Sequence, residues 1–181
     1  SDASWQTTQY AYDALGNRIQ ETRPNGVIVQ YACDILGRKT SMVVDPIDTN
    51  NPNGINQITE YGYDDIGRQI TIAGYTDNAN PTTMQTTSYE YDNKDRIIQI
   101  AYPDDAIIQY AYNAAGKIWC RTDQRGIQTY YAYDDVYNMT QKTVTMGAVT
   151  TTENFTYDGL GRMLSGQKLE GTDQVNLSVF T

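Results

Sequence analysis

The sequence predicts an all-β protein in which antiparallel strands follow one another as a meandering sheet of hairpins. Three observations predict this fold. A Tyr-x-Tyr-Asp-x-x-Gly-Arg motif recurs seven times, its base spacing is 21 residues, and no stretch shows the sustained 3.6-residue apolar period and caps of a helix. One period accommodates two strands of about six residues and two turns of about four, so each strand should run antiparallel to the one before it.

The first copy shows how one hairpin is built. Tyr10 and Tyr12 are two residues apart, which places both rings on one face of a strand. The Asp-Ala-Leu-Gly segment that follows predicts a type I turn, in which Asp13 accepts a backbone hydrogen bond and Gly16 takes a positive φ. Such a turn closes a hairpin with a β-bulge.

The second half of the repeat returns the chain. Residues 18–22 are polar and β-branched and predict a strand. Arg23-Pro24-Asn25-Gly26 predicts another turn, because Pro24 fixes φ and Gly26 closes the turn. The next copy begins at Val27.

The remaining copies keep the same pattern with substitutions. We interpret the following motif residues as a structural scaffold: Tyr10, Tyr12, Asp13, Gly16, Tyr31, Asp34, Gly37, Arg38, Tyr61, Tyr63, Asp64, Gly67, Arg68, Tyr89, Tyr91, Asp92, Arg96, Tyr110, Tyr112, Gly116, Tyr131, Tyr133, Asp134, Tyr157, Asp158, Gly161 and Arg162. The departures from the motif are Asn17-Arg18, Cys33, Asp95, Asn113, Lys117, Tyr137, Asn138 and Phe155.

The spacing predicts one domain, a single repeat array over residues 1–181. The seven copies span about 10–164, with the last one truncated. Three insertions lengthen the base period, at 45–55, 77–87 and 146–151, and their Asn, Asp, Thr, Pro and Gly residues predict loops. Because the tyrosines recur at one register, we expect an aromatic face on which rings stack as ladders from strand to strand.

Composition excludes several functions. The net charge of −9 opposes binding to nucleic acid and to anionic membrane surfaces, and no apolar run is long enough for membrane insertion. The chain has no histidine, which excludes Ser-His and Cys-His catalysis and histidine metal sites. Cys33 and Cys120 lack the CxxC spacing; we interpret each as a small buried hydrophobe and expect no bond between them.

Two candidate sites in the sequence have a simpler structural interpretation. The recurring aspartates could form the paired carboxylates of a glycoside hydrolase, but their place at turn starts favours a structural role. The segment 48–54 resembles a calcium loop only weakly, because Pro52 occupies a ligand position. We therefore expect no catalytic residue, no metal and no cofactor. Asn138, Asn154 and Asn176 begin glycosylation-type triplets that we expect to be unmodified.

The motif resembles the Rhs or YD-repeat family, named for its Tyr-Asp step, over about 155 of the 181 residues. This family includes bacterial polymorphic toxins, insecticidal toxin complexes and the animal teneurins, and its repeats form a sheet that spirals into a hollow shell. The resemblance implies a curved segment of a β-shell, secreted or at the bacterial cell surface, with motif residues that are scaffold residues. It also implies irregular turns where Asp95, Asn113 and Tyr137 depart from the pattern, and no self-cleavage at Asp45-Pro46.

The leading functional hypothesis is a non-enzymatic wall segment of a shell that encloses or displays a toxin or other C-terminal domain. Its partner would be the rest of the same polypeptide. The alternative is an extracellular adhesin-like module that binds a carbohydrate or a protein, because the many tyrosines together with Trp5 and Trp119 could stack on sugar rings. We also expect the isolated fragment to form a homodimer through its sheet edges and aromatic face.

Overall fold

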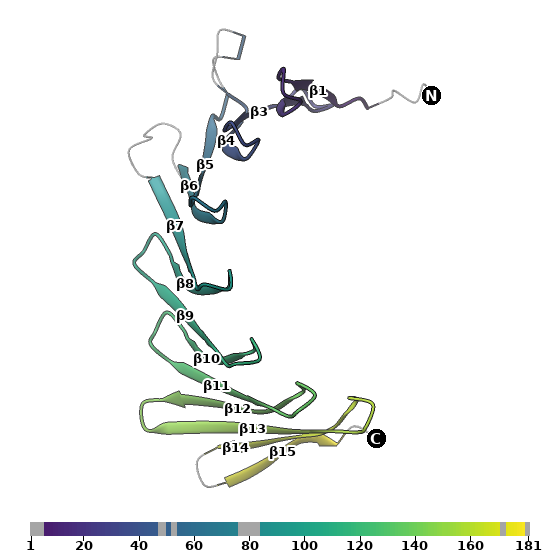
Figure 1. The fold of residues 1–181 in the computed structure, drawn as a ribbon, viewed down its shortest axis with the longest axis vertical. Coiled ribbons are helices and arrows are strands. Elements are labelled where there is room, and N and C mark those ends of the chain that lie inside the picture. The colour runs from purple at the N-terminus through teal and green to yellow at the C-terminus, as the bar shows by residue number, and fades with distance from the viewer. Residues whose placement is uncertain (1–5, 47–49, 52–53, 76–83, 171–172, 180–181) are drawn as a thin grey trace. The chain divides into compact units, whose positions relative to one another are not determined.

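A computed structural model describes residues 6–46, 50–51, 54–75, 84–170 and 173–179, with the backbone alone described at 170 and 173–179. These described residues form fifteen strands and no helix, so none could cross a membrane as a helix. The chain divides into two compact units, Ser1–Tyr89 and Glu90–Thr181, and each is described by itself. The all-β, antiparallel prediction is confirmed (Figure 1).

In the first unit each strand pairs antiparallel with the next along the chain. The strands are β1 (Gln9–Tyr12), β2 (Arg18–Thr22), β3 (Ile28–Cys33), β4 (Lys39–Val44), β5 (Gln57–Tyr63), β6 (Gln69–Tyr75) and β7 (Met84–Tyr91), of which β7 crosses the boundary between the units. The strand predicted over residues 18–22 is β2, with the same bounds.

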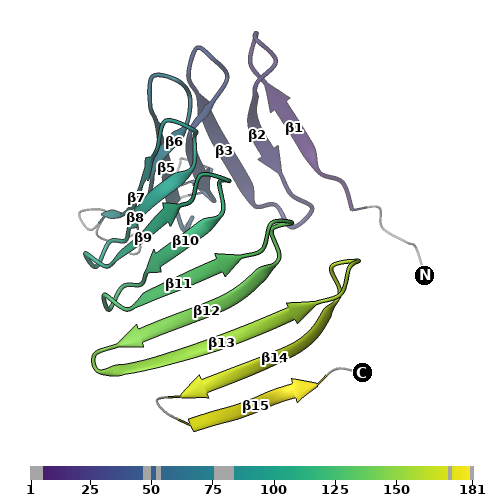
Figure 2. The same cartoon turned by 60° about the horizontal axis from the view of Figure 1, so that its bottom comes forward.

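The second unit continues the same meander, and Figure 2 shows β11 to β15 side by side in chain order. Its strands are β8 (Ile97–Ala101), β9 (Ile107–Tyr112), β10 (Ile118–Thr122), β11 (Gln128–Tyr133), β12 (Met139–Met146), β13 (Val149–Tyr157), β14 (Met163–Glu170) and β15 (Asp173–Val179).

A β-bulge lies beside the Tyr-Asp step, as the turn chemistry predicted. The register shifts between Ala11 and Tyr12 in β1, and at the equivalent step of β3, β5, β11 and β13. The fifth hairpin has the same shift, because Ala111 and Tyr112 of β9 pair with Cys120 and Ile118 of β10. In all of these hairpins the extra residue lies on the even-numbered strand.

The prediction of loops at the three insertions is wrong for one insertion and partly wrong for another. Residues 146–151 are not a loop, because β12 extends to Met146 and β13 begins at Val149, which leaves a two-residue turn. The β-branched residues Val149 to Thr152 favour this extension of the strands. In the second insertion Met84 to Thr87 belong to β7, and residues 77–83 lie outside the described part. The first insertion connects β4 to β5 as a loop, described in part.

Few residues are buried in either unit. Among the described residues the buried ones are Val29, Pro46, Ala73, Ile108, Cys120 and Thr129. Three of them, Val29, Ile108 and Thr129, precede the first tyrosine of a motif by two residues and so share its face. Of the cysteines, Cys120 is buried as predicted, whereas Cys33 is half-buried.

Candidate functional site: the repeat turns

The motif residues occupy equivalent places in every hairpin. We call the seven turns that follow the Tyr-Asp step the YD turns. The tyrosines lie in the odd-numbered strands: Tyr10 and Tyr12 in β1, Tyr31 in β3, Tyr61 and Tyr63 in β5, Tyr89 and Tyr91 in β7, Tyr110 and Tyr112 in β9, Tyr131 and Tyr133 in β11, and Tyr157 in β13. The turns run from Asp13, Asp34, Asp64, Asp92, Asn113, Asp134 and Asp158 to the residue four positions later.

The backbone of a YD turn is held by two hydrogen bonds. In the second turn the Asp34 amide donates to the carbonyl of Arg38 at 2.9 Å, and the Gly37 amide donates to the carbonyl of Asp34 at 2.9 Å. Gly37 has a φ of 76°, in the left-handed region that glycine adopts without strain. All seven YD turns have the same pair of bonds, which confirms the predicted turn.

The expectation of irregular turns at the fourth to sixth hairpins is wrong. Asp95 (φ 61°) and Tyr137 (φ 68°) take the positive φ of the missing glycine, and the turn that begins at Asn113 keeps both backbone bonds. Turn length and the bulge fix this conformation, so the side chain at the fourth position adapts to it. Aspartate tolerates the left-handed region well, whereas a tyrosine there is strained.

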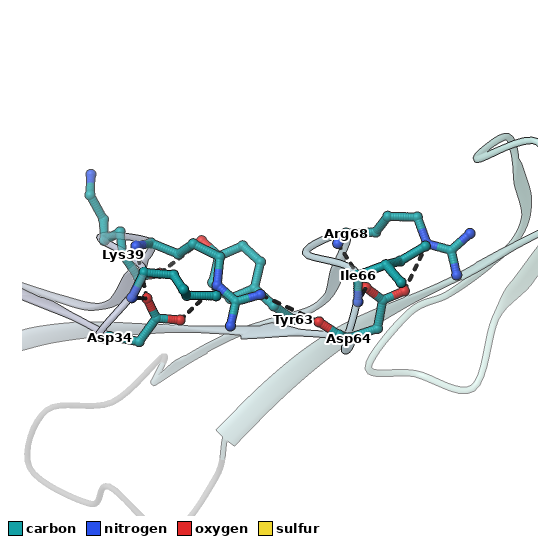
Figure 3. Close-up of polar contacts among 8 residues, drawn as sticks. Asp34, Lys39, Tyr63, Asp64, Ile66 and Arg68 are labelled. Carbon is teal, nitrogen blue, oxygen red and sulfur yellow. Dashed lines mark hydrogen bonds and ion pairs between the residues drawn. The ribbon is translucent and has the colours of Figure 1, made fainter.

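The aspartate side chain closes the turn from inside. The Oδ1 atom of Asp34 accepts the amides of Leu36 and Arg38, both at 2.9 Å, and Oδ2 accepts Nε of Arg38 at 2.6 Å. Asp64 repeats this arrangement with Ile66 and Arg68 (Figure 3). Within five residues, the aspartate of the motif therefore both closes an Asx-type turn and forms an ion pair with the arginine.

Asparagine replaces the arginine in two turns without loss of the side-chain bond. Asn17 Nδ2 donates to Asp13 Oδ2 at 2.9 Å, and Asn138 Nδ2 donates to Asp134 Oδ2 at 3.0 Å. Arg18, one residue beyond the motif position, lies in β2 with its guanidinium 4.9 Å from the centre of the Tyr31 ring.

These contacts keep the aspartates ionised. The hydrogen bond from Arg96 lowers the pKa of Asp92 to about 2. At Asp34 and Asp64 desolvation alone would raise the pKa, but hydrogen bonds from the turn amides and the arginine outweigh it, so the pKa is lowered. A carboxylate with a lowered pKa and occupied oxygens is a poor general acid.

The second tyrosine of a motif is bonded to the preceding hairpin. Tyr63 donates its hydroxyl to the carbonyl of Lys39 at 2.8 Å, so in Figure 3 its ring lies between the two turns. Three tyrosines of the second unit repeat this bond: Tyr112 to Ile97, Tyr133 to Ile118 and Tyr157 to Met139, at 2.7 to 2.8 Å. In every case the acceptor is the residue directly after a YD turn.

A cation from the preceding turn covers some of these rings. The guanidinium of Arg38 lies 4.8 Å from the centre of the Tyr63 ring, and that of Arg96 lies 4.3 Å from the centre of the Tyr112 ring. The tyrosine ladders that we predicted are therefore wrong at these positions, where the ring stacks on a cation. The motif tyrosines stand on every second strand, about 9.6 Å apart, which leaves room for the arginine between them.

The polar groups of the YD turns make their bonds within the chain itself. Each YD aspartate bonds within its own turn, and the described residues contain no group of three or more Cys, Asp or Glu that could hold a metal ion. The segment 48–54 lies largely outside the described residues. The arrangement therefore closes a turn and joins it to its neighbour.

Two features of the turns were missed in the sequence. Five YD turns carry an exposed aliphatic residue at their third position, 71% to 81% exposed: Leu15, Leu36, Ile66, Val136 and Leu160. An Asp-x-[Leu/Ile/Val]-Gly pattern could have revealed four of them. The second feature is the turn at Asp123, between β10 and β11, which has the same Asp-x-x-Gly sequence and the same capping bonds.

The RHS Repeat family model matches residues 1–28 and 12–46. The model thus covers residues 1–46 of the 181-residue chain. These residues contain the first two YD turns, and the same turn geometry recurs five more times in the chain. No curated protein matches its sequence.

Solved structures of low sequence identity share the fold. The crystal structure of TcdB2-TccC3-Cdc42 has a TM-score of 0.73 at 19% identity, over 94% of this chain and 9% of that one. The Photorhabdus luminescens Tc holotoxin pore has a TM-score of 0.71 at 18% identity, again over 94% and 9%. The chain thus spans about a tenth of the length of these chains. Neither structure supports the adhesin alternative.

Proposed function

We propose that this chain is a non-enzymatic structural segment of an Rhs or YD-repeat protein, and that it forms the wall of a β-shell that encloses or displays a toxin or other C-terminal domain of the same polypeptide. The observation that carries the proposal is the repeated bond between hairpins. A tyrosine hydroxyl of one repeat is bonded to a carbonyl of the repeat before it, both in the first unit and in the second. Such nearest-neighbour bonds build an extendable sheet from identical units.

The thin core supports a role as part of a larger assembly. Only six of the described residues are buried, while apolar side chains at the turn tips, such as Ile35 and Leu160, are 90% and 81% exposed. Apolar surface of this kind marks contact sites. The rest of the same polypeptide is the partner that we propose for it, because the chains that share the fold are about ten times longer.

The proposed absence of enzyme activity follows from the use of the carboxylates. An aspartate that accepts two amides and an arginine, as Asp158 does, has no oxygen placed for substrate. Replacing Asp158 by Asn should therefore change the stability of the protein and no turnover. A hydrolase activity that is lost in Asp158→Asn at unchanged stability would overturn this part of the proposal.

The isolated chain should also associate with itself. An open sheet leaves unpaired backbone groups at its edges, and the tyrosine face is only half-buried. At about 0.15 M salt the Debye length is about 8 Å, so the net charge of −9 opposes contact only weakly. Sedimentation equilibrium over a hundredfold concentration range should show a dimer, and a monomer up to about 100 μM would contradict this.

Enclosure is tested on the protein encoded by the complete reading frame that contains this sequence. We propose that this protein is secreted or exposed at a bacterial cell surface. Limited proteolysis should cleave any segment that follows the array only after the repeats are unfolded, and electron microscopy should place residues 1–181 in the wall of a hollow particle. A following segment that is cleaved at once in the folded protein, or a frame that encodes no such segment, would overturn enclosure.

A further inference from the structure

Positive side chains gather on the tyrosine face of the first unit. Glu21 of β2 pairs with Tyr10 of β1, and its side chain therefore lies on that face. The Oε1 atom of Glu21 accepts Nε of Arg23 at 3.1 Å, and Oε2 lies 3.4 Å from Nη1 of Arg18. Two arginines thus converge on one carboxylate. Together with Lys39 of β4 they form what we call the cation cluster.

The ring of Tyr31 separates two cations of the cluster. Cζ of Arg18 lies 4.9 Å from the centre of this ring, and Nζ of Lys39 lies 4.4 Å from it. Since β3 carries Tyr31 and lies between β2 and β4, the two cations approach the ring from its two sides. Arg18 also lies 5.5 Å from the centre of the half-exposed Tyr10 ring. Cations and aromatic rings therefore alternate across the first four strands.

The cluster has more positive charge than its contacts neutralise. Glu21 is the one carboxylate bonded to it, so three cations and one carboxylate give a local charge of +2 in a chain of net charge −9. Arg23 uses only Nε in its bond to Glu21. Its remaining N–H groups and the ammonium group of Lys39 have no hydrogen bond or ion pair within the described part of the chain.

A cleft beside the cluster contains further donors. It has a volume of about 530 Å³, within the ~300 to 1,000 Å³ range of ligand sites, and is lined by Gln6, Thr8, Glu21, Arg23, Pro24 and Asn25. Oδ1 of Asn25 accepts the amide of Val27 at 3.2 Å, which leaves the side-chain NH₂ group of Asn25 as a donor. Both oxygens of Glu21 are already occupied. The cleft therefore suits a ligand that accepts hydrogen bonds.

The repeat does not require these charges. The second and third copies have the apolar residues Met42 and Ile72 in place of Glu21, each paired with the first tyrosine of its motif as Glu21 is. Val44 takes the place of Arg23 in the second copy. Strands and turns form in those copies without the two charges. The charges of the first copy are therefore available for a ligand.

We infer that the cation cluster binds an acidic segment of a polypeptide in an extended conformation. Carboxylates on alternate residues of an extended chain lie on one side and are about 7 Å apart. Such a row can contact Lys39 and Arg18 on the two sides of Tyr31, and Arg23 at the cleft. A guanidinium group offers paired N–H donors that match the two oxygens of a carboxylate.

Other ligand classes fit the cluster less well. A single small anion such as phosphate contacts only one of the separated cations. A long polyanion, such as a nucleic acid or a sulfated polysaccharide, would extend past the cluster and meet a chain of net charge −9. A neutral ligand would desolvate Arg23 without supplying a charged partner. The arrangement favours several carboxylates on a short, flexible backbone.

The test measures the binding of defined peptides to the 181-residue chain. A fluorescein-labelled nonapeptide of alternating Glu and Ala is titrated with the protein by fluorescence anisotropy, and the nonapeptide of alternating Gln and Ala is the uncharged control. We expect saturable binding of the Glu peptide, at least about tenfold tighter than that of the Gln peptide. Binding should weaken between about 0.1 M and 0.5 M salt, because salt screens exposed charges.

Variants locate the binding. Arg23→Gln should weaken the affinity for the Glu peptide at least about tenfold, and Lys39→Met about threefold. The matched control is Arg125→Gln, which removes the same charge from an exposed arginine of the second unit that is also paired with one carboxylate. This control should leave the affinity unchanged. Circular dichroism checks that each variant is folded; if Arg23→Gln is not, Lys39→Met and Arg23→Lys, which keeps the charge but loses the paired donors, decide.

Four results would overturn the inference. The first is no saturation by the Glu peptide up to about 1 mM, the limit of weak specific binding. The second is an equal affinity for the Glu and Gln peptides. The third is an equal loss in Arg23→Gln and Arg125→Gln, which would reveal a general charge effect. The fourth is displacement of the peptide by inorganic phosphate at matched ionic strength, which would assign the cluster to a small anion. The wall proposal is independent of these results, because it is tested on the complete particle.

Discussion

The YD turns and the turns that return the chain share one backbone conformation but differ in their side chains. The return turns at 23–27, 102–106 and 123–127 have the same two backbone bonds and the same positive φ at the fourth residue, at Gly26, Asp105 and Gly126. Their third residues are polar: Asn25, Asp104 and Arg125. Five of the seven YD turns have exposed aliphatic tips. A YD turn can also contact the next YD turn, as Arg38 does through the carbonyl of Asp64.

This difference separates two requirements that the motif combines. Reversing the chain needs only a short turn with one residue at positive φ, and Arg23 begins such a turn without an aspartate. The Tyr, Asp and Arg of the motif add a second property, because they connect each hairpin to the next. The Tyr, Asp and Arg of the motif are therefore explained by contacts between repeats more than by the formation of the turn.

The largest expected effect is acid unfolding. The pKa values of Asp13, Asp34, Asp64, Asp92, Asp134 and Asp158 are lowered below the ordinary 3.8, to about 2 at Asp92. Carboxylates whose pKa is lower when folded stabilise the protein above the unfolded value, so stability should be full above about pH 5 and fall between about pH 4 and pH 2.

Urea titrations between pH 7 and pH 2 measure this loss. The aspartate Asp123 of a return turn also has a lowered pKa, so Asp92→Asn and Asp123→Asn compare the two kinds of turn directly. The acid transition should weaken more in Asp92→Asn. Equal changes would show that stacking between repeats does not depend on the charge.

Glycine substitution should affect both kinds of turn alike. Gly161 of a YD turn and Gly126 of a return turn have φ values of 77° and 78°, where a β-branched residue is strained. Gly161→Val and Gly126→Val should each destabilise by about 1 to 3 kcal/mol in denaturant melts. A Gly161→Val protein as stable as the parent would contradict the turn assignment on which the repeat rests.

Removing one tyrosine hydroxyl should show how much the bond between hairpins contributes to stability. Tyr112→Phe loses the 2.7 Å bond to the carbonyl of Ile97 and should cost about 0.5 to 1.5 kcal/mol. Tyr10→Phe is the matched control, because the Tyr10 ring lies near Arg18 but its hydroxyl has no bond among those described. Differential scanning calorimetry should place the transition of Tyr112→Phe lower, and equal transitions would remove the hydroxyl bond as a source of repeat cohesion.

The smallest expected effect is at Tyr137. This residue has a φ of 68°, and its half-exposed ring lies 5.5 Å from Nζ of Lys117. Tyr137→Gly relieves backbone strain but increases the entropy of the unfolded chain, so the stability should change by less than about 0.5 kcal/mol. A loss above 2 kcal/mol would show that the ring, not the backbone, holds this turn.

Local features were predictable from the sequence, and contacts between hairpins were not. The turn at Asp13 and the strand over residues 18–22 follow from turn chemistry and β-propensity. The acceptor for the Tyr63 hydroxyl is the carbonyl of Lys39. An insertion separates the two residues in the sequence, and its length does not predict how β4 and β5 align. Trp119 illustrates the same limit, since strict alternation would place it with Tyr110, whereas the bulge in β10 brings it to Tyr130.

The bonds between hairpins also have a direction. Tyr63, Tyr112, Tyr133 and Tyr157 each donate to a carbonyl that lies earlier in the chain, and the guanidinium groups over the Tyr63 and Tyr112 rings also come from the earlier turn. During synthesis on the ribosome, each emerging hairpin would therefore find its docking partner already made. Force measurements on stalled nascent chains should show one folding step per completed repeat, and a single step after the last repeat would contradict this. The sheet could then lengthen in step with translation, without waiting for its C-terminal end.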